Sequence, residues 1–424
     1  MGNTRRSFLT GITGAAGLTY LRSAAASTAQ LRPLLATVSQ GSESYWKLVA
    51  QQFPLRAGKV PMNAANLCPA PRVVSERVAE LTRDEDSDIS NQNRAKFHDL
   101  QEESRQKVAE HLGVSPEEIA LVRNTSEANN IVNNGINLKT GDEIVIWEQN
   151  HPCNNVAWDV RAARFGYTIK RVTVPNTVKS DDEIVKLFEA AITPRTKLLS
   201  ITYISNTTGM RLPAKELASL ARQRGIYCHL DGAQAWGFLK LNLRDIGCDS
   251  FGASAHKWLM GPKQAGVLYV REQRIPEIWP SIVTAGWGNG VDAAAKGARK
   301  FEVMGQRDDA CLAAVGTAVD FHRAIGFENI EARTMELAAA LKAGLWKINK
   351  LKPVTPADPK LSGGVVISAL SDGDSAKMRT LIGGLYTKYG IAAVATGGLR
   401  LSPHTYNTME DIELTIRGVR ELLA

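Results

Sequence analysis

The sequence of 424 residues contains no apolar run as long as the roughly 20 residues that a membrane-spanning helix needs. It has only five cysteines, an odd number, and they are widely spaced without a Cys-x-x-Cys pair. This pattern argues against a disulfide-stabilised fold and against a zinc site. Internal repeats and low-complexity tracts are also absent, and the composition, with 44% hydrophobic and 22% charged residues, is that of a globular protein.

The net charge of +8 is small for a chain of this length. The basic residues are scattered rather than clustered with aromatic residues, so nucleic acid is not an expected partner. We expect a weakly basic, solvated surface instead.

Residues 1–26 have the three parts of an export signal in order. Arg5 and Arg6 precede Ser-Phe-Leu, a short Gly/Ala/Leu stretch follows, and Ala24 to Ala26 form a site of the A-x-A type. The paired arginines resemble a twin-arginine signal. We expect export by that route to the periplasm, without stable membrane anchoring. The alternative is an ordinary N-terminal helix that carries two arginines.

Strand and helix patterns alternate from about residue 100, which favours βαβ units around a mostly parallel sheet. Beyond residue 306 the pattern changes to helices at 309–325 and 330–351 followed by short strands. The sequence therefore predicts an α/β protein with a large domain at 60–305, a smaller α+β domain at 306–424, and a segment at 27–59 that packs on the small domain. The strands expected in the large domain are 119–122, 144–147, 197–204 and 226–230.

Lys257 is the leading candidate for chemistry. A lysine by itself is usually solvated, but this one lies in Ser254-Ala255-His256-Lys257-Trp258, among small, apolar and aromatic residues. Desolvation there lowers the pKa of the amine, which can then act as nucleophile and base. Ser254 and His256 are short polar groups suited to a phosphate.

Two motifs follow predicted strands. Asp231, in His229-Leu230-Asp231-Gly232-Ala233-Gln234, stands where open α/β sheets bind ligands. Thr125 and Ser126 begin a helix after a strand, where free N–H groups and the helix dipole attract an anion. Each motif alone is commonplace as a turn or a helix cap, so their weight comes from their combination with Lys257.

Three more residues could contact a substrate or a ring. His151 follows a strand and could stack on a cofactor ring and transfer protons, although an isolated histidine is more often structural. Arg400, near the C-terminus, suits bidentate capture of a carboxylate. Asn206, in the loop Ser-Asn-Thr-Thr-Gly, could add a polar contact.

Together these residues supply a partner for each part of pyridoxal 5'-phosphate. Lys257 would form a Schiff base with the aldehyde, and Asp231 would keep the pyridine nitrogen protonated so that the ring accepts electrons. Gln234 could reach the ring hydroxyl. The expected phosphate ligands are Thr125, Ser126, Ser254 and His256.

The order and spacing of these motifs, from residue 123 to residue 408, resemble the class V aminotransferase family of fold type I pyridoxal phosphate enzymes. The resemblance implies a seven-stranded, mostly parallel sheet and a homodimer with its active site at the subunit interface. It also implies an amino acid substrate held by Arg400 and Asn206, the latter touching the cofactor as well, and a ring stacked on His151. Gln306 stands where the family often has a threonine that reaches the neighbouring subunit's phosphate.

Within the family, the segments 206–213 and 305–308 resemble the isopenicillin N epimerase-like branch. Cysteine desulfurases carry a nucleophilic cysteine before the substrate arginine, whereas residues 389–399 contain none. Cys153, beside His151, could still approach the site.

The expected reaction begins when Lys257 removes the Cα proton of an amino acid. Reprotonation on the opposite face, for which His151 is one candidate, gives an epimer. Loss of a β-substituent makes the enzyme a C–S lyase, and protonation of the cofactor carbon makes it an aminotransferase. An epimerase-like or C–S lyase-like enzyme is the leading hypothesis. The alternatives are an aminotransferase, a cysteine desulfurase or selenocysteine-lyase-like enzyme, and a pyridoxal phosphate-binding module without turnover.

Overall fold

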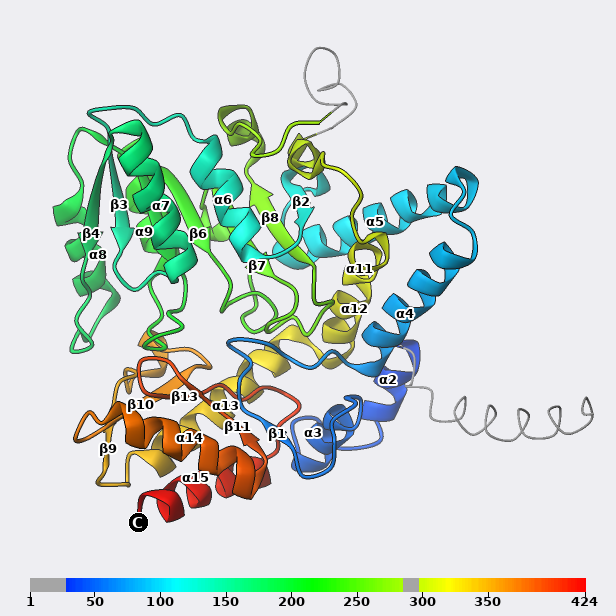
Figure 1. Cartoon of the computed structure of the whole chain (residues 1–424), viewed down its shortest axis with the longest axis vertical. Helices are drawn as coiled ribbons and strands as arrows, with labels where there is room; N and C mark the ends of the chain where they lie inside the picture. The colour runs from blue at the N-terminus through cyan, green and yellow to red at the C-terminus, as the bar shows by residue number, and fades with distance from the viewer. Residues whose placement is uncertain (1–27, 285–296) are drawn as a thin grey trace, which may run out of the picture.

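The computed structural model describes residues 28–284 and 297–424 (Figure 1). The predicted export signal at 1–26 lies outside the described residues. No helix in the described part of the chain has the length and apolar character required to cross a membrane.

A seven-stranded sheet forms the centre of the larger part of the molecule, as the sequence predicts. All neighbouring pairs are parallel except those made by β8, which is antiparallel to both of its neighbours. The strand order is β2 (Ile119–Val122), β8 (Gly266–Val270), β7 (Ser250–Ser254), β6 (Tyr227–Asp231), β5 (Thr196–Thr202), β3 (Glu143–Trp147) and β4 (Thr168–Val172).

The strands of this sheet are apolar because helices pack against it. Strands β2, β3, β6, β7 and β8 are buried along their whole length, as expected for parallel strands covered on both faces. Strands β4, β7 and β8 were not predicted from the sequence. The covering helices and turns are α6 (Thr125–Gly135), α7 (Pro152–Phe165), α8 (Asp181–Ala191), α9 (Ala214–Gln223), α10 (Leu243–Ile246), η1 (Pro116–Glu118), η2 (Glu272–Glu277) and η3 (Gly297–Glu302).

A smaller α+β part lies below the carboxyl ends of these strands in Figure 1. Its antiparallel sheet has the order β12 (Val394–Ala395), β13 (Leu399–Leu401), β10 (Val366–Leu370) and β9 (Leu351–Pro353). Beside it, β1 (Val60–Pro61) pairs in parallel with β11 (Ile391–Ala392). The helical elements of this part are α13 (Phe327–Leu345), α14 (Ser375–Tyr389), α15 (Met409–Leu423) and η4 (Pro359–Leu361).

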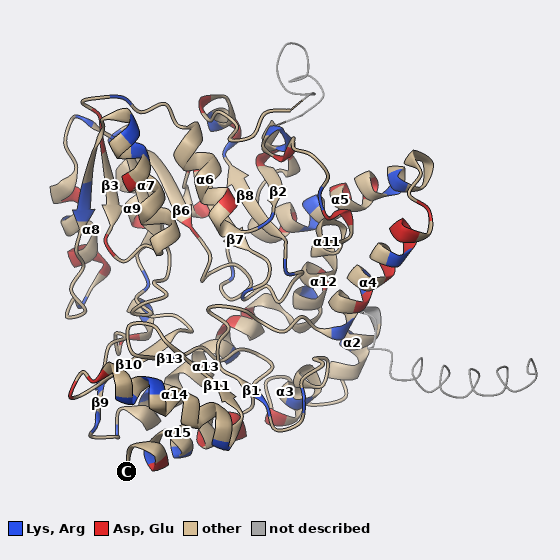
Figure 2. Cartoon of the chain, in the orientation of Figure 1, with Lys and Arg blue, Asp and Glu red and all other residues tan. Residues whose placement is uncertain are grey.

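The remaining helices connect the two parts. The Tyr45 hydroxyl donates to the Ile325 carbonyl at 3.1 Å, and Arg333 forms an ion pair with Glu43 at 2.6 Å, so the N-terminal helices contact α12 and α13. Basic and acidic residues are interspersed along these and the other helices (Figure 2). The connecting helices are α2 (Thr28–Leu35), α3 (Glu43–Ala50), α4 (Arg72–Ser87), α5 (Asn91–Leu112), α11 (Asp309–Ala313) and α12 (Val315–Ile325).

The helix expected at 330–351 is wrong at both ends. Helix α13 begins earlier, at Phe327, and stops at Leu345. Residue Leu351 instead starts β9 and pairs with Leu370 of β10. Pairing with a distant strand overrides the local helical pattern, because the sheet satisfies the backbone groups that a longer helix would have used.

Candidate active site

The sheet topology brings the predicted residues to one edge. Because β8 alone runs in the opposite direction, the carboxyl ends of β2, β3, β5, β6 and β7 lie on the same side, facing the smaller part (Figure 1). The residues at or after these ends, in strand order, are Thr125, Lys257, Asp231, Asn206 and His151. Arg400 reaches the same region from β13, where it donates to the Asn206 carbonyl at 3.3 Å.

Lys257 lies three residues beyond the end of β7 and is partly buried. Burial lowers the pKa of its amine, whereas the Asp231 carboxylate raises it and the Arg400 charge lowers it further. No ion pair joins Lys257 to a carboxylate in the part of the chain that the structure describes. The balance favours an amine that can lose its proton, as a nucleophile and base requires.

Trp258 anchors the backbone next to Lys257. Its ring is fully buried and its Nε1 donates to Gln234 Oε1 at 2.8 Å. Its carbonyl accepts hydrogen bonds from two buried histidines, His404 Nε2 at 2.8 Å and His322 Nε2 at 3.1 Å. These contacts hold the lysine backbone in place while leaving its side chain free to react.

Asp231 is fully buried and is held by a chain of hydrogen bonds. Its Oδ1 accepts from the Ala233 N–H at 3.0 Å, and its Oδ2 accepts from Asn129 Nδ2 at 2.8 Å. Asn129 Oδ1 in turn contacts His229 Nε2 at 3.0 Å, and His229 Nδ1 contacts the Ser250 hydroxyl at 2.8 Å. Burial lowers the pKa of His229 to about 3. The imidazole is therefore neutral, with its proton on Nε2, and Ser250 donates to Nδ1.

The predicted phosphate ligands surround the start of α6. The Ser254 hydroxyl lies 2.8 Å from the Thr125 N–H and 2.6 Å from its hydroxyl, and Ser126 is exposed beside them. His256 Nδ1 is buried without a partner among the described residues, and burial together with nearby lysines lowers its pKa to about 4. A cavity of about 570 Å³ opens on this helix start and is lined by residues that include Arg123, Asn124, Ser126, Glu127 and Gln264.

Arg400 is a buried cation without a carboxylate partner within the described residues. Its side chain is 5% exposed, and burial lowers its pKa to about 10, so it is charged at neutral pH. Besides the Asn206 carbonyl, it donates to Asn63 Oδ1 at 3.1 Å, while its Nε has no partner. A buried, uncompensated guanidinium is a strong site for a carboxylate.

His151 is the N-cap residue of α7, and its Nδ1 accepts the Cys153 N–H at 3.2 Å. Burial and the positive charges of Lys257 and Arg400 lower its pKa, against the effect of Asp231. His151 is therefore a neutral imidazole inside the group of charges that forms the site.

Gln234 and Gln306 are predicted cofactor ligands whose side-chain amides already have hydrogen-bond partners within the chain. The side-chain amide of Gln234 makes two hydrogen bonds within the chain. Its Oε1 accepts from Trp258 Nε1, and its Nε2 donates to the Ala65 carbonyl at 2.9 Å. Gln306 is exposed and accepts from Arg94 Nη2 at 2.9 Å. Neither glutamine is without a partner, and their predicted cofactor contacts stay predictions.

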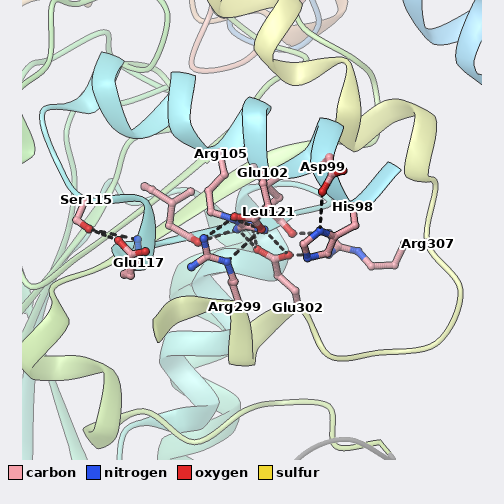
Figure 3. Close-up of polar contacts among 11 residues, drawn as sticks. His98, Asp99, Glu102, Arg105, Ser115, Glu117, Leu121, Arg299, Glu302 and Arg307 are labelled. Atoms are coloured by element: carbon pink, nitrogen blue, oxygen red, sulfur yellow. Dashed lines mark hydrogen bonds and ion pairs between the residues drawn. The ribbon is translucent and has the colours of Figure 1, made fainter. Parts of the chain in front are cut away.

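A buried network of ion pairs and hydrogen bonds fixes the position of the segment that carries Gln306. Arg105, almost fully buried on α5, bonds to both Glu102 and Glu302, and Glu302 also accepts the Leu121 N–H of β2 at 2.6 Å (Figure 3). Arg307 bonds to Glu302 at 3.5 Å and to the Leu121 carbonyl. These bonds tie residues 302–307 to the strand that leads into the helix start at Thr125.

Sequence reasoning missed three residues of this site, Asn63, Asn129 and His229. Asn129 and His229 show no motif of their own, because an asparagine inside a helix and a histidine inside a strand are ordinary. Asn63 lies far along the chain from Arg400, so only the folded structure brings them together.

The sheet and the site together define a fold type I α/β enzyme with a partly buried lysine, Lys257, at the carboxyl edge of its sheet. The model of the family Aminotransferase class-V matches residues 63–415, and this chain belongs to that family. It is an enzyme that depends on pyridoxal phosphate, as the sequence predicts.

The curated relatives include epimerases and desulfurases. Isopenicillin N epimerase of Amycolatopsis lactamdurans is 32% identical over 397 residues, covering 89% of this chain and 98% of the relative. The enzyme of the same name from Streptomyces clavuligerus is 32% identical, covering 87% and 96%. A probable cysteine desulfurase of Methanothermobacter thermautotrophicus is 28% identical, covering 88% and 97%.

Solved structures share the fold. The cystine C–S lyase C-DES in complex with cysteine persulfide is 24% identical, with a TM-score of 0.80, covering 87% of this chain and 99% of that chain. The cysteine desulfurase of Thermococcus onnurineus is 23% identical, with a TM-score of 0.79, covering 88% and 97%. These likenesses confirm the predicted fold class.

The residues at the sheet edge fit pyridoxal phosphate. Three of their buried polar atoms, Asn206 Oδ1, His256 Nδ1 and Arg400 Nε, have no hydrogen-bond partner among the described residues. Each such atom costs about 1–3 kcal/mol unless a ligand bonds to it. Asp231 would hold the pyridine nitrogen and Lys257 the aldehyde carbon. Thr125 and Ser254 would hold the phosphate.

Proposed function

We propose that this enzyme epimerises an amino acid, or an amino acid moiety of a larger molecule, at Cα. The observation that carries the proposal is that two basic groups without a carboxylate ion-pair partner among the described residues, Lys257 and Arg400, occur in one site with the buried carboxylate of Asp231. Arg400 would bind the substrate carboxylate. Lys257 would then take the Cα proton, because burial and the Arg400 charge lower the pKa of its amine and favour the neutral form that a base requires.

When bound, pyridoxal phosphate supplies an electron sink for the pair left by the Cα proton. The N–H of Ala233 and the side-chain amide of Asn129 hold the Asp231 carboxyl oxygens in place inside the protein. Trp258 and its histidine partners hold the backbone of Lys257, so that the amine meets Cα in a constant orientation.

Two observations favour epimerisation over the other outcomes. The relatives named isopenicillin N epimerase have 32% identity across nearly their whole length. The segment 389–399, which precedes Arg400, contains no cysteine that could accept sulfur. A C–S lyase, an aminotransferase and a desulfurase are the other outcomes of the test below.

The test uses the holoenzyme in heavy water with L-amino acids and isopenicillin N. Proton exchange at Cα is followed by NMR, and configuration by chiral chromatography. Exchange with inversion supports the proposal. Release of pyruvate or sulfide without inversion, or conversion of the cofactor to its amine form, would refute it.

Lys257→Ala tests the role of the lysine in the same assay. It should abolish exchange and prevent borohydride from fixing the cofactor to the chain. Lys263→Arg is the matched control, because this lysine lies six residues on, its Nζ donates to the Cys68 carbonyl, and arginine keeps the positive charge that acts on His256. Fixation of the cofactor in Lys257→Ala would contradict the assignment.

We also propose that the enzyme is a homodimer with its active site at the subunit interface. Supporting this, Trp279, Ile282 and Val283 are exposed apolar residues, and Ile282 lines the cavity at the start of α6 together with Ser126. Light scattering should give a dimer, and Trp279→Glu should shift it towards monomer with weaker cofactor binding. A monomeric, active wild type would refute the proposal.

Export by the twin-arginine route is a further proposal, supported by the Arg5-Arg6 motif. Changing both arginines to lysine should keep the protein in the cytoplasmic fraction of a bacterial host, while the wild type reaches the periplasm. Equal distribution of the two proteins would refute export by this route.

A further inference from the structure

Cys153 forms a pair with His151 inside the site. Its Sγ lies 3.0 Å from His151 Nδ1, and its backbone N–H donates to the same nitrogen. A nitrogen that accepts an N–H carries no proton, so the His151 proton is on Nε2. The thiol therefore donates towards Nδ1, and His151 is placed to exchange a proton with it.

The surroundings keep this sulfur protonated. Burial raises the pKa of the Cys153 thiol, and the Asp231 carboxylate raises it further, against smaller effects of Ser126 and Lys257. Cys153 is partly exposed at the second position of α7, so it is not sealed inside the core. A protonated, accessible thiol among the site charges is a proton donor.

The strands that lead to Cys153 and to Lys257 lie on opposite sides of the strand that ends at Asp231. Strand β6, which ends at Asp231, lies between β7 and β5 in the sheet. Lys257 follows β7, whereas Cys153 follows β3, which lies beyond β5. The charges of both Asp231 and Lys257 act on the thiol, so the groups share one site although they approach it from different strands (Figure 1).

We propose that Cys153 is the second acid–base residue of this enzyme and gives a proton to the substrate Cα on the side opposite Lys257. This inference rests on the proposed epimerase function. It assigns a catalytic role to a cysteine that lies outside the segment in which desulfurases carry theirs.

The proton balance closes without another reagent. In one direction the Lys257 amine takes the Cα proton, and the C–H electron pair stays with the cofactor-bound substrate. The S–H bond of Cys153 then breaks and its proton forms the new C–H bond, which leaves a thiolate. Water restores the thiol through His151 and takes the extra proton from Lys257. In the reverse direction the Cys153 proton first passes through His151 and water to the Lys257 amine. The resulting thiolate removes the Cα proton, and the Lys257 ammonium supplies the new one.

This arrangement predicts an asymmetry between the two enantiomers. In heavy water the wild type should exchange the Cα proton of both L- and D-forms of a substrate that it inverts. Cys153→Ser and Cys153→Ala should exchange only the enantiomer whose proton faces Lys257, with retention of configuration. The rate of inversion at Cα should fall by about 10²–10⁴-fold, which is the usual contribution of a general acid or base to a reaction rate.

Cys311→Ser is the matched control, because this thiol lies on α11 and interacts with Asp308 and the Gln264 backbone rather than with His151, Asp231 or Lys257. Cofactor absorbance and melting temperature should be unchanged in every variant. Three results would overturn the inference: inversion by the Cys153 variants within about threefold of wild type, loss of exchange for both enantiomers, or absence of inversion in the wild type. The last result, read from the wild type alone, would also refute the proposed function.

Discussion

Replacing Asn129 tests how the buried carboxylate of the site is held. Asn129 is fully buried on α6, and its amide gives Asp231 the hydrogen bond at Oδ2. A hydrogen bond to a charged group contributes about 1.5–3 kcal/mol. If this energy supports the contact of Asp231 with the pyridine nitrogen, Asn129→Ala should weaken pyridoxal phosphate binding by roughly 10–150-fold.

The same change should also lower stability, because His229 Nε2 loses its acceptor in a buried place and burial keeps that imidazole neutral. Cofactor affinity is measured by titrating the apoenzyme while following absorbance, and stability by urea unfolding. Asn130→Ala is the control, since the Asn130 side chain on the same helix bonds to the Ser126 carbonyl instead of to Asp231. A cofactor affinity within threefold of wild type, or an equal loss in Asn130→Ala, would refute the reasoning.

Two other substitutions test charge and burial. Arg400→Lys should reduce kcat/KM by about 10²–10³-fold, mainly through KM, because lysine cannot make the bidentate contact; unchanged steady-state kinetics would contradict the role of Arg400. Lys342 is buried, and burial lowers its pKa to about 8 from the ordinary 10.5, so the unfolded chain binds its proton more tightly than the native one. The free energy of unfolding of the wild type, relative to that of Lys342→Met, should therefore rise by about 3 kcal/mol between pH 8 and pH 10.5. Urea unfolding of both proteins at several pH values measures this difference. A difference that stays constant over this pH range would exclude the predicted rise.

Much of the fold is visible in the sequence because its pattern is local. The strand expected at 119–122 is β2 itself, and Gly113 ends α5 in the left-handed conformation with φ 71°. Strand β4 was missed because it lies at the edge of the sheet and has a mixed burial pattern. The helix predicted to run to residue 351 fails there because β9 pairs with β10, a contact that no local pattern contains.

The sequence by itself determined the family and the cofactor of this enzyme. Lysine, aspartate and arginine residues in a family pattern identify the cofactor class, and alternating strands and helices place those residues at strand ends. Only the tertiary structure decided which other side chains contact these residues. Asn129 and His229 support Asp231, and Cys153 contacts His151 inside the site. Strand order and side-chain burial arise from contacts between distant segments, so they cannot be predicted from local residue spacing.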